Sequence, residues 1–213
     1  MKTVMNSSNK QRTSSLLSIK SMAIMAMLSG MAIILMLFEI PLWFAPPFYE
    51  LDFSEVPILV GAFALGPMAG VVIELLKILL NLVITGTKTA GVGELANFLI
   101  GCSMVVPAAI IYHRDKTLKS AIKGLIVGTI LMVALGSIMN AFVLLPAYAY
   151  FFKMPIGELI AMGTKVNPAI DNMSTFIFYA VTPFNLLKGV VVSLITLLVY
   201  KRTSKVIKYI LSR

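Results

Sequence analysis

The stretch VPILVGAFALGPMAGVVIELLKILLNLVIT, from Val56 to Thr85, decides how many times this chain crosses a membrane. It is apolar along most of its length, and it fits either one long helix or two helices that meet at Gly66–Pro67. Proline suits the first turn of a helix, and glycine suits the end of the helix before it. The two interpretations differ by one crossing, so evidence from the rest of the chain has to choose between them.

The composition places the chain in a membrane. Its 213 residues are 59% hydrophobic and 13% charged, with a mean hydropathy of +0.94, whereas a soluble domain carries roughly 25% charged residues. The single cysteine, Cys102, excludes an internal disulfide framework and is expected to pack in an apolar stretch. We therefore predict an all-α integral membrane protein.

The positive charges choose the number of crossings. Lys and Arg gather in three regions, at residues 2–20, 114–123 and 201–213, and such clusters are retained on the cytoplasmic side. The first two clusters lie on the same side only if an even number of helices separates them, so residues 56–85 must form a helical hairpin. A crossing needs about 20 apolar residues. We predict six transmembrane helices within a membrane domain at residues 21–201, with both termini cytoplasmic as tails 1–20 and 202–213; the helices span approximately residues 21–38, 52–65, 67–84, 93–112, 123–145 and 183–200.

Three polar side chains in the last two helices are the candidate binding residues. Lys188 lies 13 residues before Lys201, or about 20 Å along a helix, which places it in the outer third of a hydrocarbon core about 30 Å thick. Asn140 lies at a similar depth, and Asn185 is one turn from Lys188. We expect Thr182 to cap the last helix, so that its N-terminus adds positive partial charge. These groups would bind a neutral, flat solute rich in carbonyls and ring nitrogens; alternatively, Lys188 extends to the lipid headgroups and the asparagines bridge helices.

The first outer loop, residues 39–55, is acidic and rich in aromatic residues and proline. Such a loop is typical of an interfacial aromatic belt, or it forms a lid over a pocket. The third outer segment, residues 147–182, is too long for a bare connection. We expect a short amphipathic helix at 154–162 and a re-entrant turn at 177–181. The candidate pocket or lid residues are Trp43, Phe48, Asp52, Phe53, Glu94 and Asn97.

Other intramembrane polar residues have simpler interpretations. Glu74 and Lys77 are spaced for a local ion pair, Glu94 is placed to stabilise the start of the fourth helix, and His113 is expected to be solvated in a basic loop. The first helix carries Ala23, Ala26 and Gly30, a pattern of small residues that lets another helix approach closely. That pattern serves either internal packing or a partner subunit.

The sequence contains neither a G-x-x-x-x-G-K-[ST] phosphate loop nor an H-E-x-x-H or Cys/His metal motif. We therefore assign no catalytic residue, no metal ligand and no cofactor, and we expect the chain not to be an enzyme.

Three blocks of the sequence resemble one known family. They are ELDFSEVPILVGAFALGPMAGVVIELLK at residues 50–77, TGTKTAGVGELANFLIG at residues 85–101 and TPFNLLKG at residues 182–189. Together they are similar to the riboflavin-specific substrate-binding (S) component of energy-coupling factor (ECF) vitamin transporters. The resemblance covers roughly residues 21–200 and implies the S-component fold of six helices.

The resemblance also implies roles for residues. In such proteins an asparagine of the fifth helix and an Asn-x-x-Lys of the sixth hold the polar end of the flavin ring, which here assigns Asn140, Asn185 and Lys188. The loop after the first helix closes over the vitamin. The first helix docks on the transmembrane coupling protein (T component) through an Ala-x-x-x-Ala surface, whose nearest match here is Ala26-x-x-x-Gly30.

The resemblance implies uptake of riboflavin, and also of flavin mononucleotide (FMN) if the pocket tolerates a phosphate, across the plasma membrane of a bacterium. Two cytosolic ATPases would supply the energy. Nucleic acid is not an expected partner. Three alternatives stay open: an S component for another vitamin, a self-sufficient transporter with Glu74 or Glu94 as proton carrier, and a membrane-embedded enzyme or assembly factor.

Overall fold

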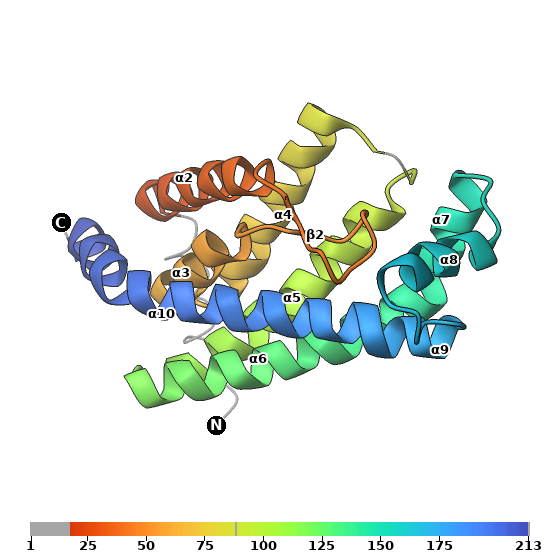
Figure 1. Ribbon diagram of the computed structural model, residues 1–213. Coiled ribbons are helices and arrows are strands. Elements are labelled where there is room, and N and C mark those ends of the chain that lie inside the picture. The colour runs from red at the N-terminus through yellow and green to blue at the C-terminus, as the bar shows by residue number, and fades with distance from the viewer. Residues whose placement is uncertain (1–17, 88, 213) are drawn as a thin grey trace, which may run out of the picture.

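The computed structural model describes residues 18–87 and 89–212, with side chains as far as Tyr200. The basic residues Lys2, Lys10 and Arg12 of the predicted N-terminal tail lie outside the described residues. Within the described part, five helices are long and apolar enough to cross a membrane, and a sixth apolar helix is shorter. The long helices α5, α6 and α10 run side by side, and α7, α8 and α9 gather at the end opposite the last turns of α10 (Figure 1).

The first helix, α2 (Ile19–Met36), begins after Ser18, whose hydroxyl accepts a hydrogen bond from the Ser21 amide. Its inner face buries Ile24, Leu28 and Ala32 against α3 and α4. The loop that follows contains a two-residue antiparallel ribbon formed by β1 (Ile40–Pro41) and β2 (Glu50–Leu51). The ribbon folds the loop back on itself, and the chain then enters α3, the next helix, at Glu55.

The stretch that decides the fold is a hairpin of α3 (Glu55–Leu65) and α4 (Pro67–Thr85). Gly66 separates them with φ 115°, a conformation that L side chains rarely adopt, and Pro67 opens α4. The break therefore lies where the sequence predicts it, although α3 begins at Glu55 rather than at 52. Short and apolar, α3 is surrounded by the other helices, and Ile58, Leu59 and Ala62 are fully buried.

Small residues hold α5 (Val92–Asp115) and α6 (Leu118–Met139) close together. A Cβ atom at Gly124 would lie 2.5 Å from the Ala108 carbonyl oxygen, and one at Gly128 would lie 2.4 Å from that of Met104. Both distances are far below van der Waals contact, so only glycine permits this approach. The turn into α6 is fixed by Thr117, whose side chain caps the helix reciprocally with Ser120.

Both remaining long helices contain a π-helical turn. The chain continues from α6 through η1 (Asn140–Leu144) into α7 (Leu145–Phe151), and from α9 (Met173–Phe176) through η2 (Ile177–Val181) into α10 (Thr182–Ser212). Each π turn ends two residues before a proline, Pro146 or Pro183. A proline ring inside a helix collides with the carbonyl four residues earlier, and here that carbonyl lies in the π turn, where the wider backbone makes room.

Four expectations about these helices are therefore wrong. The fifth helix does not end at 145, and residues 177–181 form a helical turn rather than a re-entrant one. Thr182 has helical dihedral angles and does not cap α10; the cap lies at Asn172, which bonds reciprocally with Thr175. The last helix also continues through Ser212, beyond the predicted end at 200. The π turns explain the first three differences, because they let a helix pass its proline.

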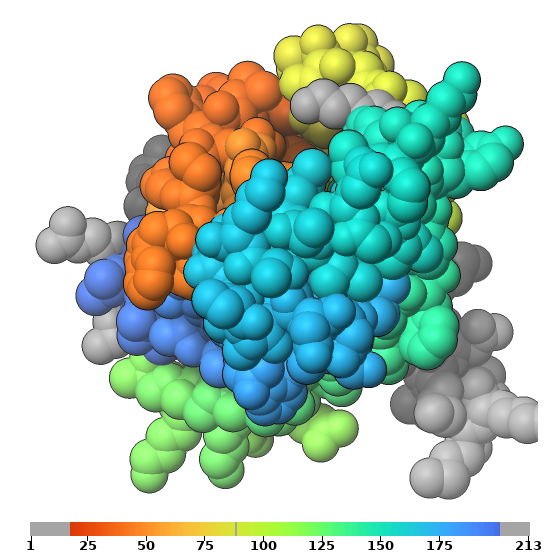
Figure 2. Space-filling view, turned by 45° about the vertical axis from the view of Figure 1, so that its right-hand side comes forward, coloured from red at the N-terminus to blue at the C-terminus, as the bar shows by residue number. Residues whose placement is uncertain are grey.

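One end of the bundle is closed by the segment at residues 147–182. There α8 (Ile156–Val166) lies near the predicted amphipathic helix and packs Leu159 and Gly163 against Phe176 and its neighbours. In the space-filling view this segment, coloured teal and blue, lies beside the orange loop that follows α2, with the yellow end of α4 above them (Figure 2).

The other end is filled by aromatic side chains. Phe63 of α3, Tyr112 of α5 and Tyr200 of α10 contact one another, and the two tyrosine hydroxyls are hydrogen-bonded. The His113 ring is half-buried there, with Nε2 3.1 Å from the Ala62 carbonyl oxygen. The expectation that His113 is merely solvated is wrong, because the side chain turns back from the basic loop onto the end of α3.

Candidate functional site

A cavity of about 690 Å³ lies at the end of the bundle closed by α8 and the loop between α2 and α3. Its lining comes from α4, α5, α6 with η1 and α7, α10 and the first residue of α3, together with the end of α2 and the loop that follows it. Its size falls within the range of about 300–1,000 Å³ that is usual for small-molecule sites.

Asn140, Asn185 and Lys188, the candidate binding residues, all line this cavity. The Asn140 amide donates to the Gly136 carbonyl at 2.8 Å, and the Asn185 amide donates to that of Val181 at 3.0 Å. A Cβ at Gly136 would lie 2.9 Å from the Asn185 nitrogen, so this glycine lets α10 place its asparagine directly against α6. Asn140 begins one π turn, and Val181 ends the other.

Tyr49 is a cavity residue that the sequence reasoning missed. Its hydroxyl donates to Oδ1 of Asn140 at 2.5 Å, and its ring packs against Phe176 and Phe184. Burial raises the pKa of this hydroxyl well above its ordinary value, so it acts as a neutral donor. Its place among the aromatic residues of the segment 39–55 was the available signal, but seven other aromatic and proline residues there look the same in sequence.

Lys188 pairs with the loop rather than with lipid. Its Nζ lies 2.7 Å from Oδ2 of Asp52, and the Lys188 side chain is only 13% exposed. Burial on its own would raise the pKa of Asp52, but the ammonium groups of Lys188 and Lys77 outweigh it and hold that pKa below its ordinary range. The interpretation that Lys188 extends to the headgroups is therefore wrong. An ammonium has three donors, so two remain for a ligand.

The six candidate pocket or lid residues divide into two groups. Phe48, Asp52, Glu94 and Asn97 line the cavity. Glu94 also lies in the first turn of α5, as expected, and accepts a hydrogen bond from Thr87. Trp43 is 89% exposed and contacts Phe44, and Phe53 packs against the central apolar core. Neither of these two lines the cavity, but both belong to the loop between α2 and α3, so their assignment to a lid stays a prediction.

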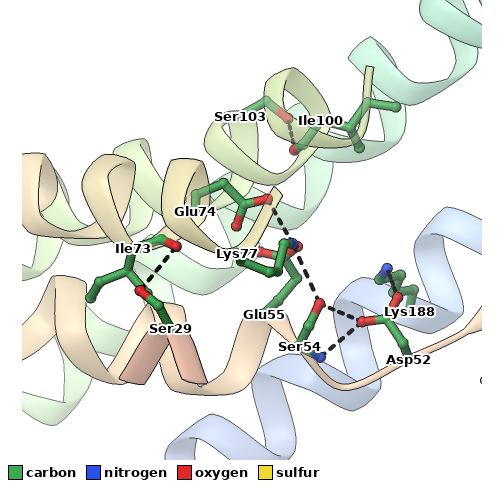
Figure 3. Close-up of polar contacts among 10 residues, drawn as sticks. All are labelled: Ser29, Asp52, Ser54, Glu55, Ile73, Glu74, Lys77, Ile100, Ser103 and Lys188. Atoms are coloured by element: carbon green, nitrogen blue, oxygen red, sulfur yellow. Dashed lines mark hydrogen bonds and ion pairs between the residues drawn. The ribbon is translucent and has the colours of Figure 1, made fainter. Parts of the chain in front are cut away.

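A chain of polar groups descends from the cavity into the bundle (Figure 3). Asp52 accepts hydrogen bonds from the backbone amide and hydroxyl of Ser54, and that hydroxyl lies 3.4 Å from Nζ of Lys77. Lys77 is in turn 2.9 Å from Glu55 and 2.7 Å from Glu74. The predicted Glu74–Lys77 pair is present, but it belongs to a cluster that also includes Glu55, the first residue of α3.

The small residues of α2 face outward. Ala23 and Ala26 are exposed, and a Cβ at Gly30 would meet nothing within 4 Å. Large apolar side chains surround them, with Met22, Met27 and Met31 each more than half exposed. Internal packing therefore does not use this face, which leaves it free for lipid or for another protein. In the part of the chain that the structure describes, no group of three or more His, Cys, Asp or Glu is arranged to hold a metal ion.

Comparisons with known proteins agree on one family. The family model for the ECF transporter, substrate-specific component, matches residues 20–200. The chain is 37% identical to the riboflavin transporter RibU of Staphylococcus aureus (strain TCH60) over 191 residues, which cover 90% of this chain and 94% of that protein. It is 31% identical to the riboflavin transporter FmnP of Bacillus subtilis (strain 168), covering 86% and 92%.

A solved structure shares the fold. It is described as "Structure and mechanism of the S component of a bacterial ECF transporter" and superposes with a TM-score of 0.68 at 36% identity. The match covers 88% of this chain and 96% of the other. The arrangement of helices described above is therefore a fold already known from a solved structure.

Proposed function

Because this chain belongs to the family of substrate-specific components of ECF transporters, we propose that it binds riboflavin with high affinity and serves as the specificity subunit for its uptake. Family members are transport subunits, so the chain is not an enzyme, and ATP hydrolysis falls to partners. Both curated relatives described above carry the name riboflavin transporter.

One observation carries the choice of ligand: two amides and an ammonium, one from η1 and two from α10, line the same cavity. Asn140 and Asn185 each supply a donor and an acceptor, and Lys188 supplies donors. The edge of an isoalloxazine ring alternates carbonyl oxygens, ring nitrogens and an N–H group, so it pairs with such a set. Phe48, Tyr148 and Phe184 line the same cavity and offer aromatic surface for the flat ring.

The loop between α2 and α3 acts as the lid in this proposal. Its Tyr49 and Asp52 contact two of the three binding residues. Riboflavin would share or replace these contacts when it enters. Desolvated polar groups that lose one partner need another, so ligand entry and lid position are coupled through Asn140 and Lys188.

The direct test is titration of riboflavin into the purified protein, with quenching of flavin fluorescence as the signal. We expect Asn140→Ala, Asn185→Ala and Lys188→Met each to weaken binding by about 1–3 kcal/mol, which is roughly 5- to 150-fold. Lys165→Met on the exposed face of α8 is the matched control and should bind like the wild type. Absence of quenching by micromolar riboflavin in the wild type would refute the proposal.

Competition separates related ligands. FMN and other vitamins are added to the riboflavin complex, and displacement is followed by the return of flavin fluorescence. Glu39, Glu50 and Glu94 near the cavity entrance carry negative charge, so we expect FMN to compete less well than riboflavin. Stronger competition by a different vitamin would reassign the substrate within the same family.

We also propose the partners and orientation that the family implies. The outward small-residue face of α2, formed by Ala23, Ala26 and Gly30, would dock on the T component, and two cytosolic ATPases would complete the complex. The cavity would face the outside of the plasma membrane. The basic turn between α5 and α6, which includes Arg114, Lys116 and Lys119, would then lie in the cytoplasm.

A further inference from the structure

The polar chain beneath the cavity holds an odd number of charged groups. Its carboxyl groups are Asp52, Glu55 and Glu74, and its ammonium groups are Lys77 and Lys188. Glu55, Glu74 and Lys77 are between 0% and 2% exposed. If every group were ionised, the buried network would carry one uncompensated negative charge.

The excess charge is located at the two glutamates. Asp52 is matched by Lys188 and by both donors of Ser54, so the remaining cation, Lys77, faces two carboxylates. Among the described residues, Oε2 of Glu55 and Oε2 of Glu74 are buried without a hydrogen-bond donor, and Oε1 of Glu74 lies 2.7 Å from Nζ of Lys77, the same ammonium that Glu55 uses. The backbone of α5 at Gly101 lies directly against the two glutamates, since a Cβ there would lie 2.6 Å from Glu74 and 3.1 Å from Glu55.

Two carboxylates that share one site in a low-dielectric interior do not both ionise, because one proton removes the repulsion and the desolvation of the second charge. That proton would also give the unsatisfied oxygens a donor. We propose that Glu55 and Glu74 hold one proton between them, so that the cluster beneath the cavity is a proton-binding site with Lys77 as the counter-ion of the remaining carboxylate.

The surroundings are consistent with this assignment. The titratable groups that face the pair are Lys77 on α4, Asp52 in the loop with Lys188 beyond it on α10, and Cys102 on α5. None of them is a second free cation that would neutralise the excess carboxylate. Glu55 lines the cavity while Glu74 lies behind it, so the proton can exchange with water in the cavity through Glu55.

Infrared difference spectroscopy tests the proposal without any ligand. At neutral pH the wild type should show the C=O stretching band of a protonated carboxylic acid, shifted in heavy water and lost at alkaline pH. Glu55→Gln and Glu74→Gln should each abolish the whole band, because the single remaining glutamate then ionises against Lys77. Glu158→Gln, on the exposed side of α8, is the matched control and should leave the band intact.

The outcomes are decisive even if a variant folds poorly, since the wild-type band is measured on the intact protein. Absence of the band at neutral pH would overturn the proposal, and recovery of a band only after sodium is removed would assign the excess charge to a bound cation instead. A band that survives in both glutamine variants would place the proton elsewhere. None of these readouts depends on riboflavin, so the proposal and the transport function can fail separately.

Discussion

The carboxylate of Asp52 joins the loop between α2 and α3 to α10 through its ion pair with Lys188. We expect this pair to hold the loop against the helix. Asp52 is 6% exposed and lies 2.7 Å from Lys188. Removing one partner of a buried ion pair costs about 3–5 kcal/mol, because the other charge is left uncompensated. Since Lys188 retains some contact with solvent, we expect the lower end of that range.

We predict that Asp52→Asn lowers the free energy of unfolding at pH 7 by about 3 kcal/mol, measured by thermal unfolding in detergent. The pKa of Asp52 is lowered in the folded state, so its contribution is present above the ordinary aspartate value of about 4 and is lost as pH falls below it. The difference between variant and wild type should therefore shrink in that acidic window. Glu50→Gln, an exposed neighbour on β2, should show no such difference.

The sequence identified single residues well where a polar group interrupts an apolar helix. Asn140, Asn185 and Lys188 stand out in this way, and all three reach one cavity. It did not single out Tyr49, and it did not separate Phe48, which lines the cavity, from Trp43 and Phe53, which do not, because loop side chains take their direction from the backbone path and not from a helical period. The two-residue ribbon sets that path, and no local pattern announces it.

The close packing of α5 against α6 depends on glycines, which have no side chain, at the points where the two helices touch. A Cβ at Gly128 would lie 2.4 Å from a backbone oxygen of α5, and a backbone atom cannot move aside as a flexible side chain can. We predict that Gly128→Ala lowers the free energy of unfolding by about 1–3 kcal/mol, as for other overpacked sites. Thermal unfolding followed by circular dichroism measures the change.

The control for this prediction is Gly30→Ala on α2, where a Cβ meets nothing within 4 Å. Alanine favours an exposed helix by up to about 1 kcal/mol over glycine, so this variant should be neutral or more stable. Equal destabilisation by both substitutions would mean that steric contact between α5 and α6 is not the cause.

Elements were predictable where hydrophobic length and charge constrain them, as in the hairpin broken at Gly66. Their ends were not predictable at Pro146 and Pro183. Proline usually marks the start of a helix, and that rule put the boundary at Thr182. The π turns at 140–144 and 177–181 remove the usual conflict and let both helices run on. The same π turns lie beside Asn140 and Asn185. The prolines that led to the wrong helix ends therefore mark the turns that position the binding residues.

At the scale of the whole molecule, the class of protein follows from composition and the family from three sequence blocks. An apolar chain with long uncharged windows has few alternatives to a helical membrane protein. What composition cannot supply is which face of the bundle meets a partner, because lipid and protein both accept apolar side chains. The outward small-residue face of α2 is the candidate.

We predict that Ala26→Trp leaves riboflavin affinity within about twofold of wild type, since the residue is exposed and does not line the cavity, but prevents co-purification with the T component. A bulky ring there would hold a neighbouring helix away from the small-residue face. Ile130→Trp on the exposed side of α6 is the matched control and should assemble normally. Normal assembly of the Ala26 variant would move the docking surface elsewhere.

The aromatic closure formed by Phe63, Tyr112 and Tyr200 has a consequence for the direction of traffic. These rings fill the end of the bundle opposite the cavity, so a ligand that enters the cavity has to leave by the same opening. Release on the other side of the membrane would therefore require the whole bundle to reorient within the bilayer.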